Sequence, residues 1–203
     1  MPNQVKFPAL APNAATGESA DMGELQSQQP FGPRVPEVPE GDNRERLVCP
    51  ECSYIRYDNP KIVAGAVVLW QGRYLLCRRA INPRKGYWTI PAGYMELNET
   101  ALDGAKREVL EEAEAEIIVD GLLAIYNIPR ISQVQLIYRA QLVEGKHGPG
   151  DESLETALFE WDDIPWDELA FPSVTWALNH HREVADEAVF QPRTNPVGDW
   201  GDY

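Results

Sequence analysis

The chain has 203 residues, of which 43% are hydrophobic and 25% are charged, so it can bury a core and is not disordered as a whole. Its 18 basic and 32 acidic side chains give a formal net charge of −14, which argues against nucleic-acid binding through a general positive field and favours affinity for cations. The longest apolar run, residues 62–70, is far shorter than the roughly 20 residues that a membrane-spanning helix requires. We therefore expect one folded domain with additional segments, no membrane segment and no nucleic-acid partner.

The N-terminal segment, residues 1–44, has the composition of a disordered tail. It carries seven prolines and no run with a helix or strand period that could bury a face. It also lacks the apolar stretch of a secretory signal. The three cysteines of the chain, Cys49, Cys52 and Cys77, are too few for a disulfide framework, which favours a reducing, cytoplasmic location.

A cysteine knuckle follows in residues 45–60, where the sequence reads Cys49-Pro50-Glu51-Cys52. A structural zinc ribbon needs two such knuckles to complete a tetrahedral Cys₄ site, and residues 29–42 offer no second one. We therefore expect a degenerate zinc-ribbon-like segment that holds no zinc.

The folded domain is predicted to begin with a hairpin and a helix. Residues 61–70 and 73–79 are rich in apolar and β-branched side chains and are separated by Gln71-Gly72, which predicts two strands. Residues 82–97 have no regular period and are predicted as a loop. Thr100 with Asp103 resembles a capping box and predicts a helix start. The buried helix face is predicted from apolar side chains at spacings of three and four, namely Leu102, Ala105, Val109 and Ala113.

The second half of the chain continues with hairpins and one more helix. We predict strands over 116–119, 122–128, 134–142 and 157–161, a Gly/Pro loop at 146–151, a helix over 172–185 and a loose segment from 191 on. Asp120-Gly121 is predicted as the turn between the first two strands, and Ser173 as the cap of the helix. This alternation favours an α/β or α+β architecture with a mixed sheet between helices.

Three carboxylates share one rim of the first predicted helix. At 100° per residue, Glu108, Glu111 and Glu112 fall within about one 100° arc. Like charges at these spacings repel, so such a rim is either a solvated surface or is balanced by a bound cation. Oxygen-only ligands of this kind suit Mg²⁺ or Mn²⁺.

The spacing of these residues resembles the Nudix box, GX5EX7REUXEEXGU, in which U is an aliphatic residue. The matching positions are Gly93, Glu99, Arg107, Glu108, Val109, Glu111 and Glu112. The resemblance covers about residues 62–184 and implies an α/β/α sandwich that hydrolyses, with Mg²⁺, a nucleoside diphosphate linked to another moiety. Glu114 and Ala115 depart from the final Gly and aliphatic residue of the box, which puts the end of the helix in question.

The same resemblance assigns roles by position. It implies that Glu111 and Glu112 are metal ligands, that Glu108 is a ligand or general base oriented by Arg107, and that the Gly93 carbonyl is a further ligand. Glu99 would be a supporting acid. A base from a later loop is also known among such enzymes, and here Glu152 and Glu155 follow the Gly148-Pro149-Gly150 loop; an ordinary solvated loop is an equally good interpretation of them.

The chain is most similar to the Nudix group that carries an N-terminal zinc ribbon and acts on FAD, ADP-ribose and related dinucleotides. The stretches that carry this likeness are VCPECSYIRYDNPKIVAG, LLCRRAINPRKGYWTIPAGYMELNET and PGDESLETALFEWDDIPWDELAFPS. Phe171-Pro172-Ser173 is also similar to part of the signature of NADH pyrophosphatases. The likeness implies cleavage of FAD to FMN and AMP, or of ADP-ribose; an NADH pyrophosphatase and a non-catalytic Nudix-fold ligand sensor stay open as alternatives.

Substrate contacts are predicted from cations and flat side chains. The candidates for the diphosphate are Arg78, Arg79, Arg84 and Lys85, and those for stacking on a base or flavin are Tyr87, Trp88, Tyr126 and Tyr138. Gln133 is a candidate through the family likeness. Burial in the core is the competing interpretation for each aromatic residue.

These predictions divide the chain into four parts. They are a tail (1–44), the degenerate ribbon (45–60), a Nudix hydrolase domain (61–187) and a C-terminal tail (188–203). The partner is a small dinucleotide substrate, and a homodimer stays open because members of this superfamily often dimerise.

Overall fold

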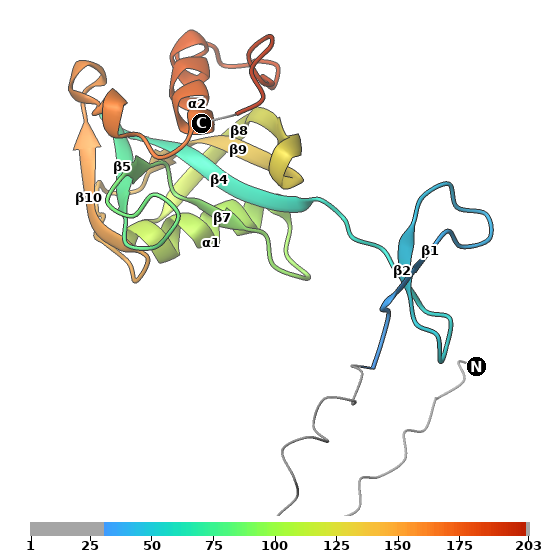
Figure 1. The fold of residues 1–203 in the computed structure, drawn as a ribbon. Helices are drawn as coiled ribbons and strands as arrows, with labels where there is room; N and C mark the ends of the chain where they lie inside the picture. Colours follow the sequence, from blue (N-terminus) through green and yellow to red (C-terminus); the bar gives the residue numbers. More distant parts are fainter. Residues whose placement is uncertain (1–30, 202–203) are drawn as a thin grey trace, which may run out of the picture. The chain divides into compact units, whose positions relative to one another are not determined.

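The computed structural model describes residues 31–201, and the chain divides after Asp58 into two compact units (Figure 1). The predicted disorder of residues 1–30 lies outside the described residues. The division falls two residues before the end of the predicted ribbon segment.

The first unit is a small antiparallel sheet in the order β1-β2-β3. Its strands are β1 (Val35–Glu37), β2 (Arg46–Val48) and β3 (Ile55–Arg56). Strand β1 lies in the segment that we predicted as tail, so that prediction is wrong for its described part, residues 31–44. The strand is held by backbone pairing of Val35 with Val48, and all three of its side chains are exposed. It therefore has no alternating apolar pattern that could have revealed it.

The second unit is built on a mixed sheet in the order β10-β5-β4-β9-β8. The strands are β4 (Lys61–Trp70), β5 (Arg73–Arg79), β8 (Ile117–Ile128), β9 (Gln133–Leu142) and β10 (Ser153–Phe159). The predicted β4–β5 hairpin is confirmed, and its turn residues Gln71 and Gly72 have φ of 50° and 82°. Strands β4 and β9 pair in parallel, whereas the other neighbours are antiparallel.

Two expectations about the strands are wrong. Strand β8 runs unbroken through Asp120-Gly121, because this pair forms a register shift in the ladder with β9 instead of a turn. The predicted loop at 82–97 contains two short strands, β6 (Trp88–Thr89), which pairs with β5, and β7 (Ala92–Tyr94), which pairs with β4.

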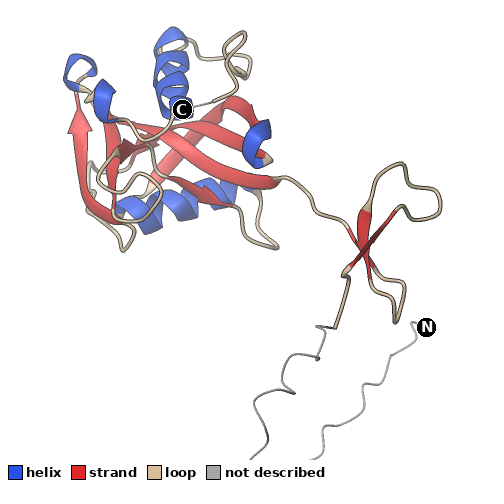
Figure 2. Cartoon of the chain, viewed as in Figure 1, coloured by secondary structure: helices blue, strands red, loops and turns tan. Residues whose placement is uncertain are grey.

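Helices cover both faces of the sheet, which confirms the predicted α/β/α sandwich (Figure 2). Helix α1 (Ala101–Ala113) packs against one face through Val109 and Ala113, and α2 (Pro172–Glu183) against the other. Three short 3₁₀ helices, η1 (Pro129–Ile131), η2 (Trp161–Asp163) and η3 (Trp166–Glu168), join the elements. Within residues 31–201, neither α-helix is long and apolar enough to cross a bilayer.

The helix ends differ from the sequence expectations at two points. Thr100 caps α1 as predicted, accepting a hydrogen bond from the Asp103 amide at 3.1 Å, but Leu102 is 37% exposed because it lies on the solvent side of the first turn. Helix α2 has no side-chain cap. Its first residue is Pro172, so Ser173 lies inside the helix instead of capping it.

The C-terminal segment is not loose up to residue 201. The Arg193 amide donates to the Leu123 carbonyl at 2.8 Å, and the Ile125 amide donates to the Arg193 carbonyl at 2.9 Å. Part of the predicted tail, residues 193–201, is therefore a strap that runs along the outer strand β8.

Candidate active site

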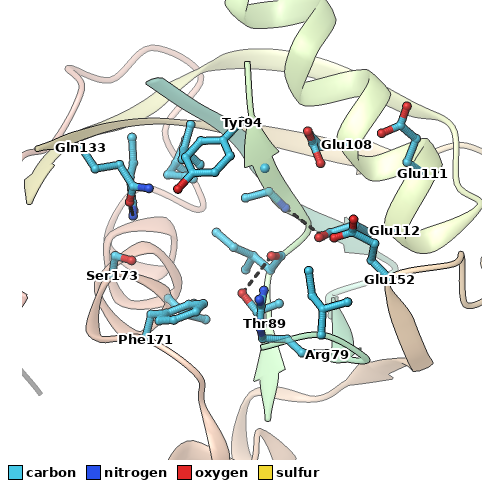
Figure 3. A pocket seen from close by; sticks show the side chains of 18 of the residues that line it. Arg79, Thr89, Tyr94, Glu108, Glu111, Glu112, Gln133, Glu152, Phe171 and Ser173 are labelled. Atoms are coloured by element: carbon cyan, nitrogen blue, oxygen red, sulfur yellow. Dashed lines mark hydrogen bonds between the residues drawn. The ribbon is translucent and has the colours of Figure 1, made fainter. Parts of the chain in front are cut away.

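A pocket of about 1030 Å³ opens beside the sheet and is lined by residues from β4, β7, α1, β9, the 147–152 loop and the start of α2 (Figure 3). This is at the upper end of the volume range of small-molecule sites. Carboxylates of α1 occupy one side of the pocket, and Gln133, Phe171 and Ser173 occupy the other.

Arg107 is the centre of an ion-pair network at the carboxylate side. Its guanidinium donates to Glu99 at 2.8 and 3.0 Å, to Glu108 at 2.7 Å and to Glu111 at 2.9 Å, and also to the Tyr94 carbonyl at 3.0 Å. The hydrogen bond from Arg107 holds the pKa of Glu99 at about 2. The planar fork thus ties the loop before α1 to the helix.

Glu108 and Glu112 are buried carboxylates, with exposed fractions of 8% and 7%. The Ala92 amide of β7 donates to Glu112 at 3.0 Å. Burial, together with the charges of Glu108 and Glu152, raises the pKa of Glu112 to about 7. Burial also raises the pKa of Glu108, although its hydrogen bond to Arg107 opposes the shift. Because the Glu108 and Glu112 carboxylates are both buried and near one another, a bound cation would stabilise their charged forms.

Gly93 of β7 lies directly against the Glu108 carboxylate. A Cβ atom at this position would overlap that carboxylate, so any other residue here would force Glu108 out of its present position. The pairing of Gly93 with Ala64 in the β7–β4 ladder fixes its place beside the helix.

The end of α1 keeps the left-handed conformation of the box even without its glycine. Glu114 caps the helix with φ 47° and ψ 36°, and its amide donates to the Leu110 carbonyl at 3.0 Å. The departure that the sequence showed here therefore leaves the helix end in place, at the cost of a conformation that side chains other than glycine adopt rarely.

The 147–152 loop packs on this end of α1. The Gly148 amide donates to the Ala113 carbonyl at 2.8 Å, and the Gly150 amide donates to the Glu112 carbonyl at 3.2 Å. Glu152 lines the pocket beside Glu112 (Figure 3). Glu155 does not, because it pairs with Arg78 at 3.0 Å on the far side of the β10–β5 ladder from the pocket lining.

The donor set of this pocket fits Mg²⁺ or Mn²⁺ in its chemistry. The atoms that could bind a metal here, from Glu108, Glu111, Glu112 and the Gly93 carbonyl, are all oxygens. Among residues 31–201 no three His, Cys, Asp or Glu side chains already converge on one point, since Arg107 holds Glu108 and Glu111. Mg²⁺ tolerates such a site because it keeps several waters and substrate phosphate oxygens as ligands.

Only part of the predicted substrate-binding set reaches the pocket. Arg79 and Gln133 line it, whereas Arg78, Arg84, Trp88 and Tyr138 do not. Tyr138 lies on the opposite face of β9 from the lining residues Gln133, Gln135 and Ile137, because side chains alternate along a strand. Trp88 is core, packed edge-on to Phe159.

Arg78, Arg84 and Tyr126 have other partners. Arg78 donates to the Gly86 carbonyl at 2.8 Å. Arg84 stacks on Tyr87 and lines a separate cavity of about 360 Å³ that shares only Phe171 and Pro172 with the main pocket. Tyr126 is fully buried and bonded to His180.

Several pocket residues were not predicted as site residues. Tyr94, Thr89, Phe171, Ser173 and Gln135 all line the pocket. Phe171 lies under the Arg79 guanidinium, 5.1 Å from its ring centroid, and Gln135 donates to Gln133 at 2.9 Å. The Phe171-Pro172-Ser173 motif was a sequence signal for two of them; the others become visible only once the strands are paired.

Two family models match the chain. The NUDIX domain matches residues 59–191, and the Nudix N-terminal zinc-ribbon family matches residues 32–58. In a solved structure, a NUDIX hydrolase from Nitrosomonas europaea is 42% identical with a TM-score of 0.75, covering 83% of this chain and 97% of that one.

Curated relatives carry more specific names. An ADP-ribose pyrophosphatase of Methanocaldococcus jannaschii is 28% identical over 58% of this chain and 71% of its own length. The NAD-capped RNA hydrolase NudC of Pseudomonas aeruginosa is 27% identical over 61% of this chain. The match spans only 45% of the NudC length.

Proposed function

Because the chain belongs to the Nudix family and is a hydrolase of pyrophosphate bonds, we propose that it cleaves, with Mg²⁺ or Mn²⁺, a nucleoside diphosphate linked to another moiety. ADP-ribose and FAD are the first candidates. The observation that carries the proposal is the pair of buried carboxylates, Glu108 and Glu112, facing a pocket large enough for a dinucleotide. The likeness to an ADP-ribose pyrophosphatase supports the substrate class.

In this proposal the pocket residues have four roles: metal binding, positioning of the ligands, proton transfer and phosphate binding. Glu108, Glu111, Glu112 and the Gly93 carbonyl would hold the metal, which when bound neutralises phosphate charge and lowers the pKa of a coordinated water. Arg107 orients Glu108 and Glu111. In this proposal Glu152, which lines the pocket next to Glu112 and comes from a separate loop, takes a proton from the attacking water, and Arg79 meets a phosphate oxygen.

The opposite side of the pocket suits the part of the substrate that does not react. Tyr94 and Phe171 offer aromatic faces, and Gln133 and Ser173 offer hydrogen bonds (Figure 3). Such a mixture of flat and polar groups fits a nucleoside.

A substrate panel tests this proposal. The full chain is incubated with Mg²⁺ and ADP-ribose, FAD, NADH or a nucleoside triphosphate, and the products are separated. We expect ADP-ribose or FAD to be cleaved, and Glu112→Gln to lower kcat by roughly 10²- to 10⁴-fold. Glu116→Gln, which changes an exposed acid beyond the helix, serves as the matched control. Binding without turnover of any compound would instead identify a ligand sensor.

NADH is the second candidate substrate. Phe171 and Ser173 of the motif shared with NADH pyrophosphatases line the pocket, and a NudC relative acts on NAD-capped RNA. The net charge of −14 repels the many phosphates of an RNA, so a free dinucleotide is the more favourable substrate. A higher kcat/KM for NADH than for ADP-ribose and FAD would give this candidate priority.

We also propose that the first unit folds without a bound zinc ion. Residues 1–58 contain two cysteines and no histidine. Arg34, which precedes β1, donates to Glu51 of the knuckle at 3.0 Å, and Glu51 accepts from the Cys49 thiol at 3.0 Å. A guanidinium at this place repels a divalent cation, and the hydrogen bond to Glu51 raises the pKa of the Cys49 thiol, whereas zinc binds thiolates.

Metal analysis of the full chain decides the zinc question. We expect far less than one zinc per chain and no effect of a chelator on alkylation of Cys49. Arg34→Ala should speed alkylation of this buried thiol, whereas Arg56→Ala, which breaks only an exposed ion pair, should not. One zinc per chain whose removal exposes both thiols would contradict the proposal.

Location and assembly complete the proposal. The three cysteines are free thiols, which supports the cytoplasmic location. Homodimer formation stays a prediction, and sedimentation velocity of the full chain checks it.

A further inference from the structure

The C-terminal strap, residues 193–201, is anchored along β8 before it turns toward the pocket. Asn195 clamps the strand from its side chain: its Oδ1 accepts from the Asn127 amide at 2.8 Å, and its Nδ2 donates to the Asn127 carbonyl at 2.8 Å. With the two backbone bonds of Arg193, the strap pairs with β8 at the end of the sheet order. Side-chain bonds that mimic a backbone ladder hold it to one register.

The far end of the strap is fixed against α2. Asp199 accepts from the Trp176 indole N–H at 3.1 Å and from the Gly201 amide at 3.0 Å. Gly201 has φ +75° and lies against Ile128 and Trp176, so that a Cβ atom would meet Ile128 at 3.0 Å. Gly201 itself lines the main pocket, together with Ile128 and Val174.

We propose that this strap is a specificity-determining wall of the substrate pocket. The inference rests on the proposed function and deepens it: the strap reaches the pocket through Gly201 beside Ile128 and Val174, residues of the β8 end and the α2 start. Ser173 and Phe171 of the same α2 start lie across the pocket from Glu108 and Glu112 (Figure 3). The strap therefore shapes the space for the nucleoside or its linked group, and none of its hydrogen bonds or ion pairs within residues 31–201 involves Glu108, Glu111 or Glu112.

This placement predicts which kinetic constant changes. A wall that contacts the unreacting part of the substrate contributes binding energy in both ground state and transition state, so its release raises KM and leaves kcat near its original value. A strap with only a structural role would lower the melting temperature and leave the affinity of the folded protein unchanged.

Two variants release the strap at different points. Asn195→Ala removes the clamp on β8, and Asp199→Ala removes the contacts with Trp176 and Gly201. Asn179→Ala is the matched control, because the exposed Asn179 side chain bonds only the Thr175 carbonyl of its own helix. We expect both strap variants to raise KM for ADP-ribose or FAD about tenfold with kcat within about threefold, and the control to behave as wild type.

Calorimetric binding of ADP-ribose in the presence of a chelator separates this inference from the proposed function. Turnover is suppressed there, so the dissociation constant reports the pocket alone. A tenfold weaker affinity in both strap variants supports the wall even if the wild type turns over no substrate. Wild-type affinity in both variants, or a loss confined to kcat, overturns it.

Discussion

Arg107 shows how one residue organises a site whose other members repel one another. Three carboxylates, Glu99, Glu108 and Glu111, share its guanidinium, and Glu111 is four residues along the same helix. Because the fork is planar and rigid, the three carboxylates receive fixed directions from one side chain. The box therefore carries its own positioning cation.

Replacing Arg107 by lysine should damage the site although the charge is kept. An ammonium group cannot serve Glu99, Glu108 and Glu111 together, so we expect kcat to fall by roughly 10- to 100-fold and the Mn²⁺ affinity to weaken. Lys106→Arg, on the exposed face of the same turn, is the control. Kinetics with the best substrate of the panel and Mn²⁺ titration measure both effects; unchanged metal affinity would contradict a positioning role.

At this scale the sequence predicts one side of the site better than the other. The helical spacing of Glu108, Glu111 and Glu112 requires only local geometry, and all three line the pocket. Tyr138 cannot share the pocket with Gln133, because the two residues are five positions apart on β9 and side chains alternate between the faces of a strand. Tyr94 and Gln135 lie on strands, and that their side chains face the pocket becomes visible only once these strands are paired.

Among the elements, the contact between the 147–152 loop and the end of α1 is the tightest close to the site. A Cβ atom on Gly150 would overlap the Glu111 carbonyl oxygen, which is backbone and cannot move aside. A Cβ atom on Gly148 would meet only the end of the Glu114 side chain, at 2.9 Å. Two glycines of one loop thus have different roles.

Gly150→Ala should therefore displace the loop and Glu152 with it. We expect a fall in kcat of about tenfold or more, since the candidate base moves from Glu112. Gly148→Ala is the matched control and should keep most of the activity, because the Glu114 side chain can rotate away. Steady-state kinetics of the two variants decide; equal activities would show that the loop does not position Glu152.

The elements that the sequence predicts well are those with strong local signals. Strands β4 and β5 have the predicted bounds, and α1 begins after the predicted cap. Strand β8 was predicted as two strands because Asp120-Gly121 is typical of a turn, yet pairing with β9 carries the chain straight through it. There, tertiary pairing overrides the local preference.

Across the whole molecule, α2 is tied to the sheet by a buried histidine. His181 is 2% exposed, and its Nδ1 lies 3.1 Å from the Tyr74 hydroxyl of β5. Burial lowers the pKa of His181 to about 4, with Arg139 adding to the shift and Asp120 opposing it. The native state thus holds this imidazole neutral.

This predicts a loss of stability in mild acid. In the unfolded chain His181 takes up a proton near pH 6.5, whereas in the folded chain it does so only near pH 4. The contribution of His181 to the free energy of unfolding is therefore fully present above pH 6.5. It is lost as the pH drops towards 4, which lowers the free energy of unfolding by about 3 kcal/mol. Urea unfolding across this range should show a shallower fall for His181→Gln. Tyr74→Phe, which keeps the imidazole, should retain most of the slope; equal slopes in wild type and His181→Gln would refute the assignment.

Because the strap lies at the end of the described chain, it also determines at what stage of synthesis the pocket is complete. Its lining begins at Val63 and ends at Gly201, almost the full length of the second unit. During synthesis the carboxylates of α1 leave the ribosome well before the strap does. A growing chain that has already paired β4 with β9 therefore carries the candidate metal-binding groups of α1 but lacks one wall of its pocket. On this view, the pocket is complete only after residues 193–201 have left the ribosome.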